Sequence, residues 1–174
     1  MNGPGGYPAE FPLEQEREFF YGKYRGVVSS VDAPTCRIKA RVPAVLGTAE
    51  TGWCMPCVPY AGPQRGIAFL PEPGSGVWIE FEGGDVSYPI WTGCYWRDGE
   101  KPPEAAPNVK VIVTASGHKL IFNDAEEGAS ITISDPNGNT VTLNASGITL
   151  KKESQQVVIA AANVSVNNGA LVVR

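Results

Sequence analysis

The final 67 residues of the chain carry regularly spaced turn signals. From residue 108 onward a residue pair ending in glycine recurs five times: Ser116-Gly117, Glu127-Gly128, Asn137-Gly138, Ser146-Gly147 and Asn168-Gly169. The first four pairs stand nine to eleven residues apart, and the segments between them alternate apolar and polar residues. Alternation is the period of a half-buried strand, and glycine readily adopts the positive φ of tight turns. The pattern therefore predicts a succession of short β-strands.

The apolar face of these predicted strands has little to pack against within one chain. Residues 108–174 contain a single aromatic side chain, Phe122, and a lone sheet would leave both of its edges unpaired. Identical copies wound around a common axis would bury the face and pair the edges. We therefore predict an intertwined trimeric β-helix or β-prism, because small side chains fill a three-sided prism; an ordinary sandwich within one chain is the alternative. The predicted trimer core is Ile131, Ile133, Val141, Leu143, Ile148, Leu150, Val164 and Val166.

Composition changes abruptly near residue 107. Fourteen of the 15 prolines, 15 of the 16 aromatic residues and all four cysteines precede residue 108. Such a shift across a polar, proline-rich stretch indicates a boundary between two architectures. We predict an N-terminal extension over 1–20, a folded domain over 21–97, a linker over 98–107 and a needle over 108–174.

The predicted domain at 21–97 is made of short strands. Segments rich in β-branched and aromatic residues, bounded by Gly, Pro and Asp, predict strands within 21–32, 35–43, 76–85 and 87–96. About five strands in so short a domain favour a five-stranded OB-fold barrel. The fold class is thus all-β, with a short helix predicted only over 13–20.

The stretch from Trp53 to Cys57 reads WCMPC, one residue away from a thioredoxin motif. Redox chemistry of that type needs the first cysteine at the start of a long helix, and the prolines and glycines after Cys57 exclude one. A zinc site joining this pair to Cys36 and Cys94 is a second hypothesis, although zinc sites usually have two such pairs. Buried thiols packed as small hydrophobic groups are the favoured interpretation.

No catalytic, metal or cofactor site is predicted from the other polar residues. His118 is the single histidine and lacks a carboxylate at catalytic spacing, so a turn or packing role is favoured. In a trimer, three copies of His118 near the axis are an alternative site for an ion.

Charge and hydropathy exclude several partner classes. The net charge is −4 and the sequence pI is about 5.0, which gives no general attraction to phosphate backbones or anionic membranes. No apolar run of about 18 residues is present. The N-terminus lacks the basic and apolar regions of a secretory signal, so we expect assembly in the cytoplasm of the producing cell.

Residues 59–96 contain four glycine and proline motifs in a fixed order: Pro-x-Ala-Gly, Leu-Pro-x-x-Gly-x-x-Val, Phe-x-x-Gly-Asp and Pro-x-x-x-Gly. With the later runs SGHKLIFND (116–124) and GNTVTLNASGITL (138–150), this arrangement resembles the phage baseplate assembly protein V and VgrG spike family. The OB-fold turn residues that the resemblance implies are Gly62, Pro71, Gly74, Gly84, Asp85 and Gly93.

The resemblance implies a homotrimeric central spike in the baseplate of a contractile tail or injection system. VgrG proteins carry their own hub domains, whereas few residues precede the first predicted OB strand here, so a separate hub protein is implied. The expected hub contacts are Phe11, Leu13, Phe19, Phe20 and Tyr21. Because the chain ends without a His-x-His pair, a PAAR-type tip protein is the implied cap.

The function predicted from the sequence is mechanical. A homotrimer docked on a hub would pierce the target cell envelope when the sheath contracts, without enzymatic activity, as part of a phage tail or phage-tail-like particle. The alternative is an OB-fold module that binds single-stranded nucleic acid or oligosaccharide through exposed aromatic residues such as Trp78, Trp91 and Trp96.

Overall fold

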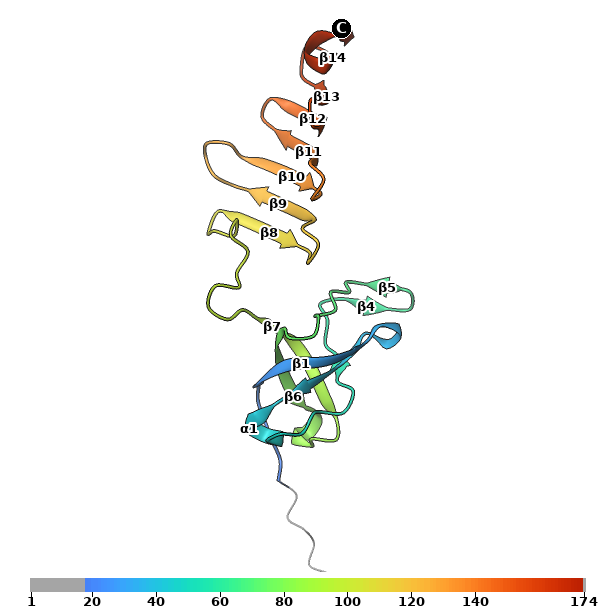
Figure 1. Ribbon diagram of the computed structural model, residues 1–174, viewed down its shortest axis with the longest axis vertical. Helices are drawn as coiled ribbons and strands as arrows, with labels where there is room; N and C mark the ends of the chain where they lie inside the picture. The colour runs from blue at the N-terminus through green and yellow to red at the C-terminus, as the bar shows by residue number, and fades with distance from the viewer. Residues whose placement is uncertain (1–17, 174) are drawn as a thin grey trace, which may run out of the picture. The chain divides into compact units, whose positions relative to one another are not determined.

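The structure is a computed structural model that describes residues 18–173. The chain forms two compact units, one ending at Arg97 and the other beginning at Asp98. The first unit is a curled, OB-like sheet, and the second is an antiparallel β-sheet (Figure 1). The predicted all-β fold is confirmed. No helix in residues 18–173 has the length and apolar character needed to cross a membrane.

The sheet of the first unit has five strands in the order β2-β1-β6-β7-β3. Their bounds are Tyr24–Asp32 (β1), Arg37–Arg41 (β2), Met55–Pro56 (β3), Gly76–Phe81 (β6) and Pro89–Tyr95 (β7). β3 is parallel to β7, and the other neighbours are antiparallel. The strands predicted within 21–32, 35–43, 76–85 and 87–96 are therefore confirmed, although each strand is shorter than its segment at one end or both.

Shorter elements connect these strands. They are the 3₁₀ turn η1 (Ala33–Thr35), the helix α1 (Pro43–Leu46), the 3₁₀ turn η2 (Glu82–Gly84) and a small hairpin of β4 (Ala61–Gly62) and β5 (Arg65–Gly66). The β4-β5 hairpin forms a separate two-stranded sheet that projects from the barrel (Figure 1). The helix predicted over 13–20 lies mostly outside the described residues, and Glu18–Phe20 are not helical.

Alternate residues of the strands build a closed core in the first unit. On β6, Val77, Ile79 and Phe81 are buried, whereas Trp78 and Glu80 face outward and are half-buried, as expected for a strand with one face on a core. The complete buried apolar cluster is Val28, Ile38, Ala40, Val42, Cys54, Val77, Ile79, Phe81 and Trp91.

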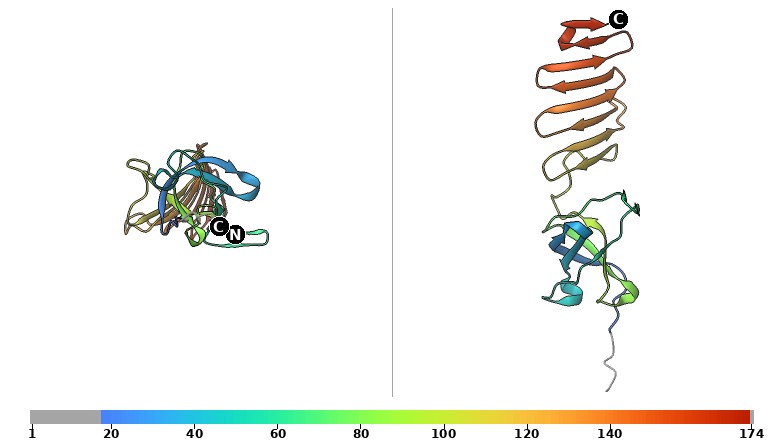
Figure 2. Two further views of the ribbon diagram at one scale, coloured as in Figure 1. Left: turned by 90° about the horizontal axis from the view of Figure 1, so that it is seen from below. Right: turned by 90° about the vertical axis from the view of Figure 1, so that its right-hand side faces the viewer.

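The second unit is a meander of eight antiparallel strands, each paired with the next along the chain. The strands form successive rungs (Figure 2, right). Their bounds are Val109–Val113 (β8), Lys119–Asn123 (β9), Ser130–Ser134 (β10), Asn139–Asn144 (β11), Gly147–Lys152 (β12), Gln155–Ile159 (β13), Val164–Val166 (β14) and Leu171–Val173 (β15), with the 3₁₀ turn η3 (Asn167–Gly169) before β15.

The turn signals of the sequence lie where these strands reverse direction. Gly117, Gly128 and Gly138 have φ of +88°, +87° and +79° between successive strands, a region that residues with a Cβ atom enter at a cost. The turn between β12 and β13 lacks this signal because Glu153, at φ +52°, occupies the left-handed position instead of glycine. The predicted trimer core contains no residue of β13.

The second unit has no closed core. Among residues 98–173 no side chain is buried; every one is half-buried or exposed. A single-layer sheet of this length leaves both faces open to solvent, so nothing within residues 98–173 supplies the hydrophobic burial that normally stabilises a fold.

Candidate functional site

One face of the second unit carries two continuous rows of apolar side chains, which we call the apolar face. Residues directly opposite one another in an antiparallel sheet point to the same face, so the strand register defines the rows. The first row is Ile112, Leu120, Ile133, Val141, Leu150, Val157, Val166 and Leu171. The second row is Phe122, Ile131, Leu143, Ile148, Ile159, Val164 and Val173, preceded on β8 by Lys110.

The apolar face is open in the single chain. Ile133 is 52% exposed and Leu150 is 45% exposed, although each side chain gains about 1.5–3 kcal/mol when fully buried. Side chains of the first row line a shallow concavity of about 780 Å³. An exposed apolar surface that runs the length of a sheet indicates an interaction site.

The opposite face of the same sheet is mainly polar. Thr132, Thr142 and Thr149 lie directly opposite one another on β10, β11 and β12, and serines and a lysine continue this surface on the same strands. The difference between the faces follows from the two-residue period, because a shift of one residue would exchange them.

The turn between β10 and β11 contains a network of hydrogen bonds around Asp135. Its Oδ1 accepts from the backbone N–H groups of Asn137 (3.0 Å) and Asn139 (2.9 Å), and its Oδ2 accepts from Asn139 Nδ2 (2.6 Å). The amide of Asn139, followed by the backbone donors, lowers the pKa of the Asp135 carboxyl below its ordinary value. The ionised side chain therefore fixes the turn that sets the register of β11.

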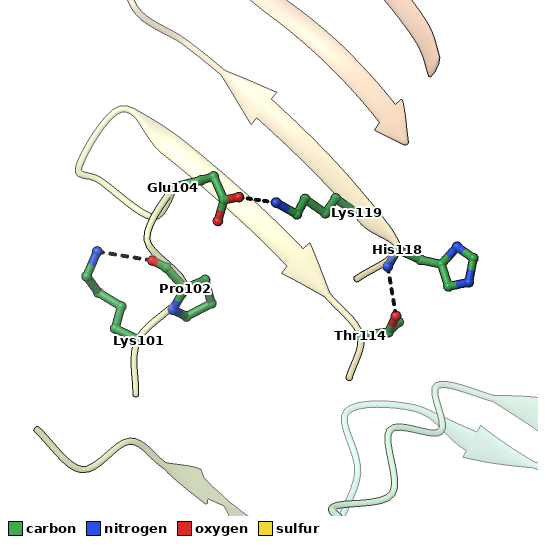
Figure 3. Close-up of polar contacts among 6 residues, drawn as sticks. All are labelled: Lys101, Pro102, Glu104, Thr114, His118 and Lys119. Atoms are coloured by element: carbon green, nitrogen blue, oxygen red, sulfur yellow. Dashed lines mark hydrogen bonds and ion pairs between the residues drawn. The ribbon is translucent and has the colours of Figure 1, made fainter. Parts of the chain in front are cut away.

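The segment before β8 contacts the next hairpin through an ion pair. The carboxylate of Glu104 accepts a hydrogen bond from Lys119 Nζ, which lowers the pKa of Glu104. Figure 3 shows this pair on one side of β9, with the His118 ring pointing to the other side. The His118 backbone N–H donates to Thr114 Oγ1 at 3.1 Å. This contact between the predicted linker 98–107 and a strand was not predicted, because no local pattern indicates it.

Aromatic residues at the start of the described chain form a second exposed surface. Phe19 and Tyr21 stack with ring centroids 6.3 Å apart, and Tyr21 is 72% exposed. Phe20 points the other way, packing edge-on against Tyr24 and Phe81, while its N–H donates to the Gly84 carbonyl at 2.8 Å. Phe20 thus anchors a segment whose outward side chains are Phe19 and Tyr21. Phe11 and Leu13 lie outside the described residues.

Comparison with family models matches both units. Residues 24–96 match the type VI secretion system/phage-baseplate injector OB domain, and residues 109–172 match the phage baseplate V C-terminal trimerisation domain. The chain belongs to the phage baseplate V family. Comparison with curated proteins finds no match.

Membership of the baseplate V family explains the apolar face. The domain that contains both rows is a trimerisation domain, which supports a homotrimer with a structural role in the baseplate of an injector of the phage-tail type. All eight residues of the predicted trimer core lie in the two rows. The rows also contain residues outside the predicted trimer core: Ile112, Leu120, Phe122, Val157, Ile159, Leu171 and Val173. Alternation at Val157 and Ile159 was the available signal for β13.

The predicted OB-fold turn residues of this baseplate V family chain occupy several kinds of position. Gly74 (φ +92°) and Gly84 (φ +82°) lie in turns, Pro71 is buried, and Asp85 Oδ1 accepts from the Ser87 N–H at 2.9 Å. Gly62 and Gly93 differ from the prediction, because they lie in strands β4 and β7. Gly93 (φ +141°) lies where the pairing of β6 with β7 shifts register, and glycine suits such a bulge.

The four cysteines of the chain are free thiols. Only Cys54 is buried; Cys36 is half-buried, and Cys57 and Cys94 are exposed, so the prediction of buried thiols is wrong for these three. Burial raises the pKa of the Cys54 thiol, the opposite of what a reactive thiolate requires. The WCMPC stretch includes strand β3 and is not the start of a helix. Within residues 18–173 no group of three His, Cys, Asp or Glu side chains is arranged to hold a metal ion.

The aromatic residues considered for base stacking differ in accessibility. Trp91 is only 5% exposed, so it offers no stacking surface, contrary to the nucleic-acid alternative. Trp78 is half-buried beside Tyr95, with the Arg25 guanidinium 5.7 Å from the centroid of each ring. This arrangement already pairs the outward rings with a cation of the same sheet.

Proposed function

We propose that the chain forms the homotrimeric central spike of a contractile tail or injection system. The trimer would dock on a separate hub protein and pierce the target cell envelope mechanically when the sheath contracts, without enzymatic activity. Assembly in the cytoplasm of the producing cell and a PAAR-type protein at the needle tip complete the proposal.

The observation that carries this proposal is the uncovered apolar face. Two rows made mainly of Ile, Leu and Val run along a sheet that has no buried side chain among residues 98–173. Three copies related by an axis would place six rows toward one another and exclude water from them. A sheet held on one face by two other copies resists bending, which suits the transmission of thrust.

The exposed pair Phe19 and Tyr21 supports docking on a hub. Aromatic side chains supply large contact areas at interfaces, and Phe20 holds the segment against the OB-like unit. In the producing strain, a variant with both Phe19→Ala and Tyr21→Ala should leave the trimer intact and reduce its incorporation into particles. Trp96→Ala, which removes an exposed aromatic residue elsewhere on the unit, is the matched control. Normal incorporation of the double variant would argue against this hub contact.

The first test is the absolute mass of the purified protein by light scattering on a sizing column. A mass near 55.5 kDa, three times the 18.5 kDa of one chain, that persists in high salt would support the spike. A mass near 18.5 kDa would contradict it and favour the OB-fold binding module instead.

A further inference from the structure

The strands from β10 to β14 share one pattern of side chains on the apolar face. On β12, Ile148 and Leu150 occupy the middle of the strand and belong to the two apolar rows. The position before them on the same face is the short Ser146, and the position after them is the long, charged Lys152. Alternation along the strand points these end positions to the same face as the rows.

The end positions of successive strands form two borders of the apolar face. Antiparallel neighbours meet at each turn, so the register places all short end positions along one side of the sheet and all polar ones along the other. The strand ends lie along these two sides in Figure 2, right. The short border is Ala129, Ala145, Ser146, Ala161 and Ala162, and the polar border is Asp135, Asn139, Lys152, Gln155 and Asn168.

The polar border can be covered by another chain at little cost. Asn139 Nδ2 donates to Asp135 Oδ2 at 2.6 Å, and Gln155 Oε1 accepts from Asn167 Nδ2. Polar groups that are already paired lose no hydrogen bond when water is excluded. Lys152 can keep its ammonium group in water while its alkyl stem is covered. The concavity of about 780 Å³ beside the first apolar row is lined by four members of this border: Asp135, Asn139, Lys152 and Gln155.

The dimensions of the sheet suit a three-sided prism. An axis parallel to the two rows lets three apolar faces cover one another along their whole length, with the strand ends of neighbouring copies meeting at three corners. Strands β10 to β13 have five or six residues, which is a length of about 17–20 Å. The centre of such a prism is about 5–6 Å from each face, half of the roughly 10 Å between packed sheets. The Ile, Leu and Val side chains of the rows can fill this centre.

The corners of the prism have less room than its centre. A rotation by one third of a turn carries each copy onto the next, so every corner joins one border to the opposite border. The two faces converge there, and long side chains pointing inward from both would occupy the same space, which destabilises a core as overpacking does. A border of Ala and Ser beside a border of long polar residues avoids this conflict.

We infer that the polar border of each copy packs against the short border of the next copy around the trimer. This inference rests on the homotrimer of the proposed function, and the borders are continuous with the apolar face of the trimerisation domain. The contact brings Lys152 of one copy to Ser146 of the next. It gives the three copies a fixed direction around the axis, which the apolar rows alone do not specify.

Cross-linking of the full-length trimer tests the inference. The starting chain has serine at Cys36, Cys57 and Cys94, none of which is buried. With Ser146→Cys and Lys152→Cys together, a bifunctional thiol reagent shorter than one strand, about 17 Å, should give covalent dimers and trimers on a denaturing gel. Each single variant should give only monomer, because identical positions stand at different corners, about 17–20 Å apart. Products in a single variant, or none in the double variant while its mass remains that of a trimer, would overturn the inference.

A change of size at the short border is an independent test. Ser146→Leu should overpack the corner and lower the dissociation temperature of the trimer, followed by far-ultraviolet circular dichroism, by about 5 °C or more. Adding Lys152→Ala should recover part of that loss, because it makes room on the border that faces Ser146. Thr149→Leu, on the opposite face of β12, is the matched control and should change the temperature little.

The outcomes separate this contact from the trimer itself. An unchanged dissociation temperature in Ser146→Leu, an equal loss in Thr149→Leu, or no recovery with Lys152→Ala would contradict the contact between borders. A monomeric mass for the unmodified protein would contradict the proposed function.

Discussion

The two units of this chain use the same strand alternation with opposite results. In the OB-like unit, alternate residues of curled strands meet across a barrel, and side chains such as Ile38 and Ile79 are fully buried. In the second unit, equally apolar residues such as Ile133 stay half exposed because the sheet remains a single layer. An apolar stripe therefore specifies that a face must be covered, while the curvature of the sheet determines whether the same chain covers it.

The largest expected effect comes from charging the apolar face. Val141→Asp should abolish the trimer, because three carboxylates would lie in a desolvated centre. The mass by light scattering should fall to that of one chain, 18.5 kDa. Tryptophan fluorescence should stay native, since all four tryptophans precede residue 97.

Thr142, the residue after Val141, provides the matched control for the Val141→Asp variant. Thr142 lies on the opposite face, between Thr132 and Thr149, so Thr142→Asp should keep the trimer. A stable trimer in Val141→Asp, or loss of the trimer in Thr142→Asp, would show that the inward face is assigned incorrectly.

Cavity formation in the barrel should affect only the first unit. Ile38 is fully buried, and Ile38→Ala should lower the free energy of unfolding of the OB-like unit by about 2–5 kcal/mol. The measurement is denaturant unfolding followed by tryptophan fluorescence, with Arg37→Ala on the exposed side of the same strand expected to change it by no more than about 0.5 kcal/mol. Loss of the trimer mass in Ile38→Ala would mean that the two units are not independent.

A substitution where β12 begins, after the turn from β11, should destabilise the second unit alone. Gly147 has φ +132°, and a Cβ atom there would lie 2.0 Å from the Ile159 carbonyl oxygen. Gly147→Ala should lower the stability of the trimer by at least about 1 kcal/mol and reduce its dissociation temperature in far-ultraviolet circular dichroism. Gly128→Ala is the comparison, because its Cβ atom meets no atom within 4 Å. An equal effect at both positions would exclude the contact with Ile159 as the cause.

The smallest expected effect is the dependence of the needle on acid. The pKa values of Asp135 and Glu104 are lowered from ordinary values of 3.8 and 4.5, so their ionised forms stabilise the folded state above those values. That contribution should disappear as the pH falls through the lowered values in the folded state. The dissociation temperature of the trimer should therefore drop between pH 5 and pH 3, and Asp135→Asn combined with Glu104→Gln should flatten the drop. An unchanged slope in the double variant would contradict these assignments.

Much of the candidate site could be predicted from local patterns. The glycine pairs at 117, 128 and 138 located the turns, and alternation between them assigned residues such as Val141 and Leu143 to one face. Local patterns missed β13, because Glu153 takes the left-handed turn position where glycine was expected. They also missed the hairpin β4-β5 and the exposed Tyr60 and Phe69 beside it.

Most of the strands, the turns that contain glycine and the apolar face of the second unit could be predicted from the sequence alone, because these properties depend on period and on backbone freedom over a few residues. The tertiary structure was needed to show that the buried Trp91 has no hydrogen-bond partner for its Nε1–H among residues 18–173, that Phe20 turns inward while Phe19 and Tyr21 stay outside, and that residues 59–69 are exposed. These features depend on how segments distant in the chain meet, and such contacts leave no periodic pattern in the sequence.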